Sequence, residues 1–183
     1  MPQASSMSII KVKNIELITF SVIFVTLAVA LPWLAHQFNL AGPTFLPMHL
    51  FVLTAGLLFG WRAGLMVGLF TPLVSYLTSG MPLAPVLPQI TLEVMAYGFF
   101  AGLFREKLKL NIYFSLLLAL LAGRLILLTT VWILGTSFLA SLTALEKAIT
   151  LGWPGILIQL ALVPMLVIKL KKIFESRSFK AES

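Results

Sequence analysis

Residues 112–134 read IYFSLLLALLAGRLILLTTVWIL, an apolar block of 23 residues that contains one charged side chain, Arg124. An α-helix rises 1.5 Å per residue, so this block would form a helix about 34 Å long. The hydrocarbon core of a bilayer is about 30 Å thick, which such a helix can cross. We therefore predict that the chain spans a membrane at this block.

Further apolar blocks lie on either side of it, and together they predict six spans. The sequence is 60% hydrophobic and 10% charged, whereas about a quarter of the residues of a soluble domain are charged. We predict an all-α integral membrane protein whose six transmembrane helices form a compact N-in/C-in bundle. The expected spans are residues 15–35, 45–60, 61–78, 88–104, 112–134 and 148–168, with residues 135–147 as a polar loop.

The chain divides into three expected segments. Residues 1–14 are a cytoplasmic lead, residues 15–170 the six-helix transmembrane domain, and residues 171–183 a basic cytoplasmic tail. The first apolar run follows Lys11 and Lys13. It is long for the core of a signal peptide and lacks a convincing small-residue cleavage site, so we expect it to remain as the first span. The protein is thus expected to be a multi-pass protein of the cell (cytoplasmic) membrane.

The basic residues predict the orientation. Eleven of the 13 Lys and Arg residues fall on one side of the six-span arrangement, Lys147 falls on the other, and Arg124 lies inside a span. Cytoplasmic loops are enriched in Lys and Arg, so that side is the cytoplasm. The net charge of +7 is spread over these loops and forms no single stripe, which argues against a nucleic-acid partner. The eleven residues are Lys11, Lys13, Arg62, Arg105, Lys107, Lys109, Lys169, Lys171, Lys172, Arg177 and Lys180.

Glycines recur every four residues in two places. They are Gly56, Gly60, Gly64 and Gly68, followed later by Gly98 and Gly102. Small residues at this interval let helix backbones approach closely within a membrane. The pattern indicates either packing inside the bundle or docking of another membrane subunit. The first span also carries small residues, and we take Ser21, Thr26 and Ala30 as candidates for contact with a partner.

Two ionisable residues lie within apolar blocks, Glu93 and Arg124. A charge at the bilayer centre costs at least about 2.5–3.5 kcal/mol, so each residue needs a reason to be there. Glu93 is expected ~7–8 Å and Arg124 ~15 Å below the outer end of its span, and the long arginine side chain can climb toward water. They form either a structural ion pair or part of a ligand cavity in which Arg124 binds a carboxylate or phosphate.

Other polar or amphipathic groups lie in or near the outer halves of the spans. His49, Gln89, Tyr97 and Trp132 are further candidates for substrate contact, and Gln159 lies within the sixth span. For Trp132, a place in the aromatic belt at the membrane surface is the alternative.

Several chemistries are excluded by what the sequence lacks. It has no cysteine, which removes thiolate metal sites and cysteine nucleophiles. His36 and His49 have no companion ligand nearby, so we expect no metal site. The common hydrolase, zinc-protease and nucleotide-binding motifs are missing. We therefore predict a protein that is not an enzyme, needs no cofactor and cannot hydrolyse ATP by itself.

Several short segments, in this order, resemble the substrate-binding S components of energy-coupling-factor (ECF) vitamin transporters. The resemblance covers roughly residues 15–170. The segments are FLPMHL (45–50), AGLLFG (55–60), GLFTPL (68–73), SGMP (79–82), ITLE (90–93) and AGRL (122–125).

This resemblance implies a six-helix protein that captures a vitamin or vitamin precursor from outside. It implies association with a transmembrane coupling subunit and two cytoplasmic ATPase subunits, and toppling of the whole protein within the lipid bilayer. The binding pocket would lie near the external side, where Glu93, Arg124 and His49 are expected. Family members often carry two alanines four residues apart on span one for the coupling subunit, and here Thr26 precedes Ala30.

The substrate and an alternative function are left open. Arg124 favours an anionic compound, so a carboxylate-bearing vitamin such as pantothenate or niacin is our first expectation. The alternative is a structural or assembly subunit of a membrane complex, in which Glu93 and Arg124 form a purely structural pair.

Overall fold

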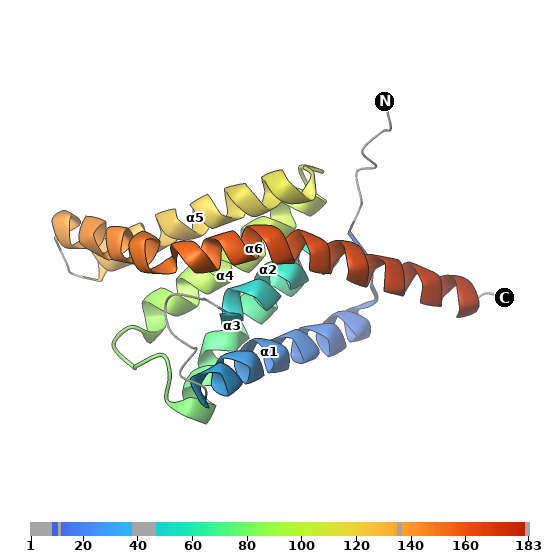
Figure 1. Cartoon of the computed structure of the whole chain (residues 1–183), viewed down its shortest axis with the longest axis horizontal. Helices are drawn as coiled ribbons and strands as arrows, with labels where there is room; N and C mark the ends of the chain where they lie inside the picture. The colour runs from blue at the N-terminus through green and yellow to red at the C-terminus, as the bar shows by residue number, and fades with distance from the viewer. Residues whose placement is uncertain (1–8, 11, 38–46, 135–136, 182–183) are drawn as a thin grey trace.

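The computed structural model describes residues 9–10, 12–37, 47–134 and 137–181. Within these residues all regular structure is α-helical (Figure 1). The amino-terminal end of α1 and the carboxyl-terminal end of α6 lie at the same end of the bundle. The helices are α1 (Asn14–Gln37), α2 (Pro47–Phe59), α3 (Trp61–Ser79), α4 (Leu87–Glu106), α5 (Ile112–Ile133) and α6 (Phe138–Ala181).

The first five helices agree closely with the predicted spans, and Pro47 begins α2 in the first-turn position, where the missing N–H is tolerated. The prediction for α6 was wrong at its start. This helix begins at Phe138 and therefore includes most of the segment 135–147 that we had expected to be a loop. Ser137 caps it by accepting a 3.2 Å hydrogen bond from the Ala140 N–H. The residues that follow are mostly good helix formers, with no Gly or Pro before Gly152.

Helix α6 also continues beyond the predicted end of the sixth span. It has 44 residues, so it is about 66 Å long and exceeds the thickness of a bilayer core. Phe174 near its far end packs against Phe20 of α1 and Phe59 of α2, with ring centroids 5.0 and 5.7 Å apart. The expected tail is thus helical as far as Ala181.

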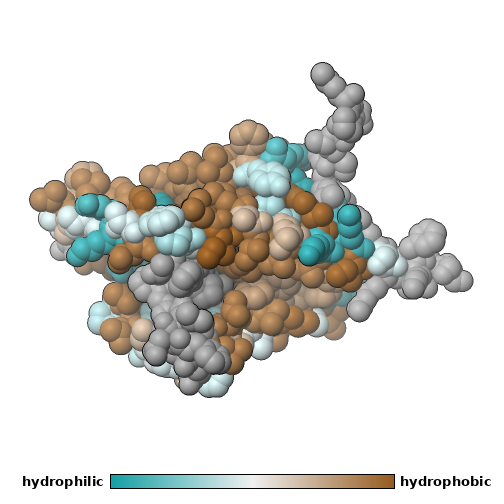
Figure 2. All heavy atoms as spheres, in the orientation of Figure 1, coloured by the Kyte–Doolittle hydropathy of each residue, from teal (hydrophilic) through white to brown (hydrophobic). Residues whose placement is uncertain are grey.

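Four helices are long and apolar enough to cross a membrane: α1, α4, α5 and α6. Figure 2 shows apolar residues over most of the visible face and hydrophilic ones mainly toward its two ends. The protein is therefore a multi-pass membrane protein. Helix α3 is not among the four, and α2, with 13 residues, is about 20 Å long, so the six-crossing topology stays a prediction.

Helix α2 occupies the centre of the bundle. It packs against all five other helices, and its residues from Val52 onward are buried. A helix that is apolar on every side suits such a position. Gly60, with φ of 90°, makes the abrupt turn into α3 in a conformation that few other residues adopt.

The glycines serve packing inside the bundle, which decides between the two interpretations of their spacing. A Cβ atom at Gly56 or at Gly64 would overlap the carbonyl oxygen of Gly98, and one at Gly98 would overlap the carbonyl oxygen of Gly64. Helices α2, α3 and α4 therefore meet backbone to backbone. This junction fixes α4, which carries Glu93 and Tyr97.

Candidate functional site

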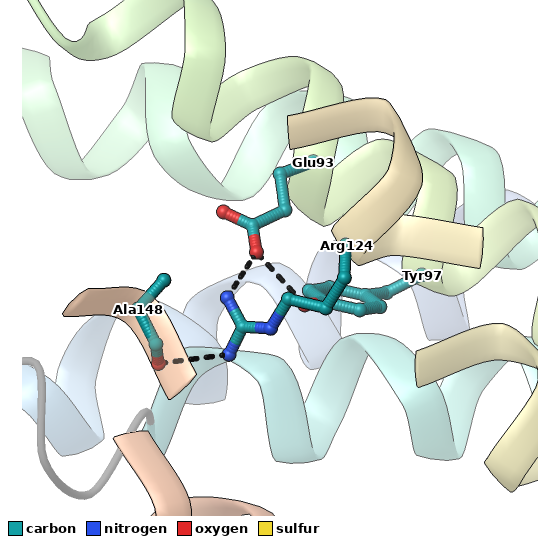
Figure 3. Close-up of polar contacts among 4 residues, drawn as sticks. All are labelled: Glu93, Tyr97, Arg124 and Ala148. Carbon is teal, nitrogen blue, oxygen red and sulfur yellow. Dashed lines mark hydrogen bonds and ion pairs between the residues drawn. The ribbon is translucent and has the colours of Figure 1, made fainter. Parts of the chain in front are cut away.

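Glu93 of α4 and Arg124 of α5 form an ion pair in the interior of the bundle. Arg124 Nη1 donates a 2.6 Å hydrogen bond to Glu93 Oε1, and the two side chains are 14% and 8% exposed for Arg124 and Glu93 respectively. Figure 3 shows the guanidinium reaching from α5 toward the carboxylate on α4. Each charge neutralises the other, so neither is left unpaired in the interior of the bundle.

Tyr97 lies one turn further along α4 and completes this pair. Its hydroxyl donates a 2.8 Å hydrogen bond to the same oxygen, Glu93 Oε1. Its ring centroid is 5.9 Å from Arg124 Cζ, a distance at which a cation interacts favourably with an aromatic face. Tyr97 is 1% exposed. The tyrosine thus holds both the carboxylate and the guanidinium in place.

Gly123 makes room for Tyr97. A Cβ atom at this position would overlap the tyrosine ring. The residue next to Arg124 must therefore lack a side chain for α4 and α5 to pack as they do. Gly123 stands beside Arg124 in the segment AGRL, residues 122–125, but we predicted no role for it.

The other edge of the guanidinium faces α6. Arg124 Nη2 donates a 3.4 Å hydrogen bond to the carbonyl oxygen of Ala148 (Figure 3). A guanidinium has five N–H donors. Among the described residues, the hydrogen bonds of Arg124 are those to Glu93 and Ala148. The arginine therefore retains donors that could bind an anionic group.

His49 also belongs to this centre. It is buried on α2, and its ring packs edge-on against Tyr97 with centroids 5.1 Å apart. The structure thus brings together Glu93, Arg124, Tyr97 and His49 from three helices. We call these four residues the polar centre.

Gln89 and Trp132 lie apart from the polar centre. Gln89 is half-buried in the first turn of α4, one turn before Glu93. Trp132 is 56% exposed and packs against Phe138, with ring centroids 6.3 Å apart. The tryptophan therefore takes the kind of exposed position that an aromatic belt requires.

The chain matches the family model described as ECF transporter, substrate-specific component, over residues 16–172. It belongs to this family. The match covers most of the described bundle, including all four residues of the polar centre. Comparison of the chain with curated proteins and with solved structures gave no match. As a substrate-specific component, the protein is a transport subunit and not an enzyme.

In this substrate-specific component, the three small residues proposed for partner contact differ in exposure. Ser21 is buried, so its side chain is not presented on the outside of α1. Thr26 is exposed, and its hydroxyl donates to the Val22 carbonyl oxygen. Ala30 is half-buried. Of the three, Thr26 and Ala30 are accessible to a partner.

Proposed function

We propose that this chain is the substrate-capture subunit of an ATP-driven ECF importer in the cell membrane. It would take up a vitamin or vitamin precursor bearing a carboxylate, such as pantothenate or niacin, and would associate with a transmembrane coupling subunit and two cytoplasmic ATPases. The observation that carries the substrate proposal is the polar centre, in which Arg124 is held by Glu93 and Tyr97 and keeps spare donors.

The geometry of the pair favours a binding role for Arg124. The Tyr97 hydroxyl and Arg124 Nη1 both donate to one oxygen, Glu93 Oε1, so the carboxylate holds the guanidinium by Nη1 alone. The bond to Ala148 through Nη2 is longer, at 3.4 Å, and hence weaker. A substrate carboxylate would displace this weaker contact and bind the planar fork of the guanidinium through two parallel hydrogen bonds. His49 would border the same site from α2.

A structural role is the second candidate, and a specific observation favours it. The polar centre already joins α4, α5 and α6 through Glu93, Arg124 and the Ala148 carbonyl. In an assembly subunit, the sole role of such a network would be to fix these three helices relative to one another. It would then contribute to stability and leave the binding of small molecules unaffected.

A pair of arginine variants distinguishes the two functions. Arg124→Gln should abolish vitamin binding by the purified protein, measured by thermal shift and titration calorimetry, and should abolish uptake by cells. The matched control is Arg62→Gln, because Arg62 lies exposed at the start of α3 and stacks on Trp61, away from the polar centre.

Copurification of the coupling subunit should be unchanged in both variants. Unchanged uptake by a folded Arg124→Gln protein would contradict the binding role and support the structural one. Stabilisation of the wild type only by neutral or cationic vitamins would contradict the choice of a carboxylate.

A further inference from the structure

The connection between α4 and α5 presents two lysines and a leucine on the outside of the protein. Both helices are long and apolar enough to cross a membrane, and residues 107–111, which we call the α4–α5 turn, join them. A connection this short between two spanning helices lies at the membrane surface. Lys107, Leu108 and Lys109 follow one another in this turn, and all three are exposed.

Hydrogen bonds hold the α4–α5 turn in one conformation. The buried Arg105 donates a 2.6 Å hydrogen bond from Nη1 to the Leu110 carbonyl oxygen. The Leu110 N–H in turn donates to the Phe104 carbonyl oxygen at 3.2 Å, and the Asn111 side chain caps α5. Within this frame Lys109 has a φ of 53°, a left-handed conformation that a residue with a side chain keeps only where its surroundings impose it. The turn therefore holds its two lysines in a fixed arrangement.

The positive charge of this turn is not neutralised by a neighbouring carboxylate. Glu106 is the only acidic residue between positions 94 and 145, and its Oε2 accepts a 3.2 Å hydrogen bond from the Trp61 N–H at the start of α3. Among the described residues, the ion pair is that of Glu93 with Arg124, so neither Lys107 nor Lys109 has a carboxylate partner there. Both ammonium groups are available to an anion from outside the chain.

Exposed apolar and aromatic side chains flank these charges. Leu108, between the two lysines, is 58% exposed, and Tyr113 and Phe114 in the first turn of α5 are each 60% exposed. A soluble anion would pair with the lysines and leave these side chains uncovered. A phospholipid offers a phosphate to the lysines and acyl chains to the apolar groups, and aromatic side chains such as that of Tyr113 are enriched at the level of the lipid head groups.

We propose that the α4–α5 turn binds an anionic phospholipid of the surrounding membrane. Lys107 and Lys109 bind its phosphate and charged head group, since basic residues beside a membrane attract anionic lipids. Leu108, Tyr113 and Phe114 pack against the acyl chains at the membrane surface. This lipid site is separate from the polar centre and does not depend on which substrate the protein carries.

Titration of the purified full-length protein with phosphatidylglycerol tests this proposal. The protein is kept in a neutral detergent, and native mass spectrometry measures the fraction that carries one lipid. The wild type should bind phosphatidylglycerol at least about tenfold more tightly than phosphatidylcholine, which has no net charge. Soluble glycerol 3-phosphate has the phosphate without acyl chains and should not compete. Equal affinity for the two lipids, or competition by glycerol 3-phosphate, would overturn the proposal.

A pair of double variants separates this turn from the other basic residues. Lys107→Gln combined with Lys109→Gln should reduce the preference for phosphatidylglycerol about fivefold for each lysine removed. The matched control combines Lys169→Gln with Lys172→Gln, which removes the same charge from exposed positions of α6 on the same predicted side of the membrane, and should keep the preference. An equal loss in both double variants would assign the effect to the overall charge of that side and overturn the site.

Leu108→Ser distinguishes a lipid from a soluble or protein partner, because it leaves the charge of the turn unchanged. It should weaken phosphatidylglycerol binding at least about threefold, since a lipid loses an apolar contact. Unchanged lipid affinity in this variant would contradict the proposal. Loss of the coupling subunit on purification of the double lysine variant, with lipid binding intact, would instead show that the turn contacts a protein. The lipid series on the wild type decides the question even where a variant does not fold.

Discussion

Gly123 and Tyr97 are complementary across the α4–α5 interface: the ring of Tyr97 occupies the space that a side chain at Gly123 would fill. The tyrosine hydroxyl in turn holds the Glu93 carboxylate that pairs with Arg124. Because Gly123 on α5 has no side chain, the Tyr97 ring fits beside it, and the Tyr97 hydroxyl on α4 can reach Glu93. Gly123 thus positions the polar centre through Tyr97.

Gly123→Ala should therefore displace Tyr97 and disturb the polar centre. Overpacking of this kind typically costs about 1–3 kcal/mol, which should appear as a lower thermal midpoint in detergent. Substrate affinity should fall as well, because the guanidinium loses its fixed position. Leu121→Ala on the exposed side of the same helix is the control and should change neither quantity. An unaltered affinity in Gly123→Ala would show that Tyr97 does not position the site.

The ion pair can be dissected by a double-mutant cycle. Glu93→Gln or Arg124→Met alone leaves one buried charge without its counterpart, which destabilises a protein by about 3–5 kcal/mol. The double variant leaves neither charge and should be more stable than either single variant. Thermal unfolding and ligand binding are measured on all four proteins. We expect the double variant to recover stability without recovering carboxylate binding, and recovery of binding would refute the role of Arg124 as ligand.

The glycine junction should tolerate no side chain. Gly98→Ala would place a methyl group against the carbonyl oxygen of Gly64, and a backbone atom at a three-helix contact cannot rotate away as a side chain can. We expect a loss of at least about 1–3 kcal/mol and a lower yield of folded protein from membranes. Leu92→Ala, on the exposed side of the same helix, should express at the wild-type level. Normal folding of Gly98→Ala would mean that α3 and α4 can separate at this point.

Much of this architecture could be predicted from the sequence, and the failures have physical causes. Apolar blocks located five helices closely, because membrane helices require long apolar runs. The prediction missed the start of α6 because it located helices by their apolar residues. Glu146 and Lys147 are polar but helical, so this criterion assigned them to a loop. The pairing of charges was considered because an isolated charge within a membrane is so unfavourable.

The remaining parts of the site depend on relationships that a sequence does not display. The carbonyl oxygen of Ala148 bonds to Arg124, yet every residue has a carbonyl, so no residue type marks it. The role of Gly123 depends on how α4 and α5 are rotated relative to each other. Gln159 was visible as a polar residue in a span, but its lack of a partner became evident only from the packing around it.

The orientation and the six-crossing topology can be tested by cysteine labelling, since the chain contains no cysteine of its own. Arg62 and Leu83 are exposed near opposite ends of α3. If α3 crosses the membrane in the N-in/C-in arrangement, Arg62→Cys is cytoplasmic and Leu83→Cys is external. A membrane-impermeant maleimide added to intact cells should then label Leu83→Cys and should label Arg62→Cys only after the cells are opened.

A third position, Lys172→Cys near the end of α6, should behave like Arg62→Cys, because the basic residues predict the cytoplasm for both. The central position of α2 explains how so short a helix can belong to a spanning bundle: its neighbours, and not lipid, surround most of its length. Labelling of Arg62→Cys and Leu83→Cys from the same side would show that α3 does not cross. The expected position of the polar centre near the external side of the membrane would then be wrong.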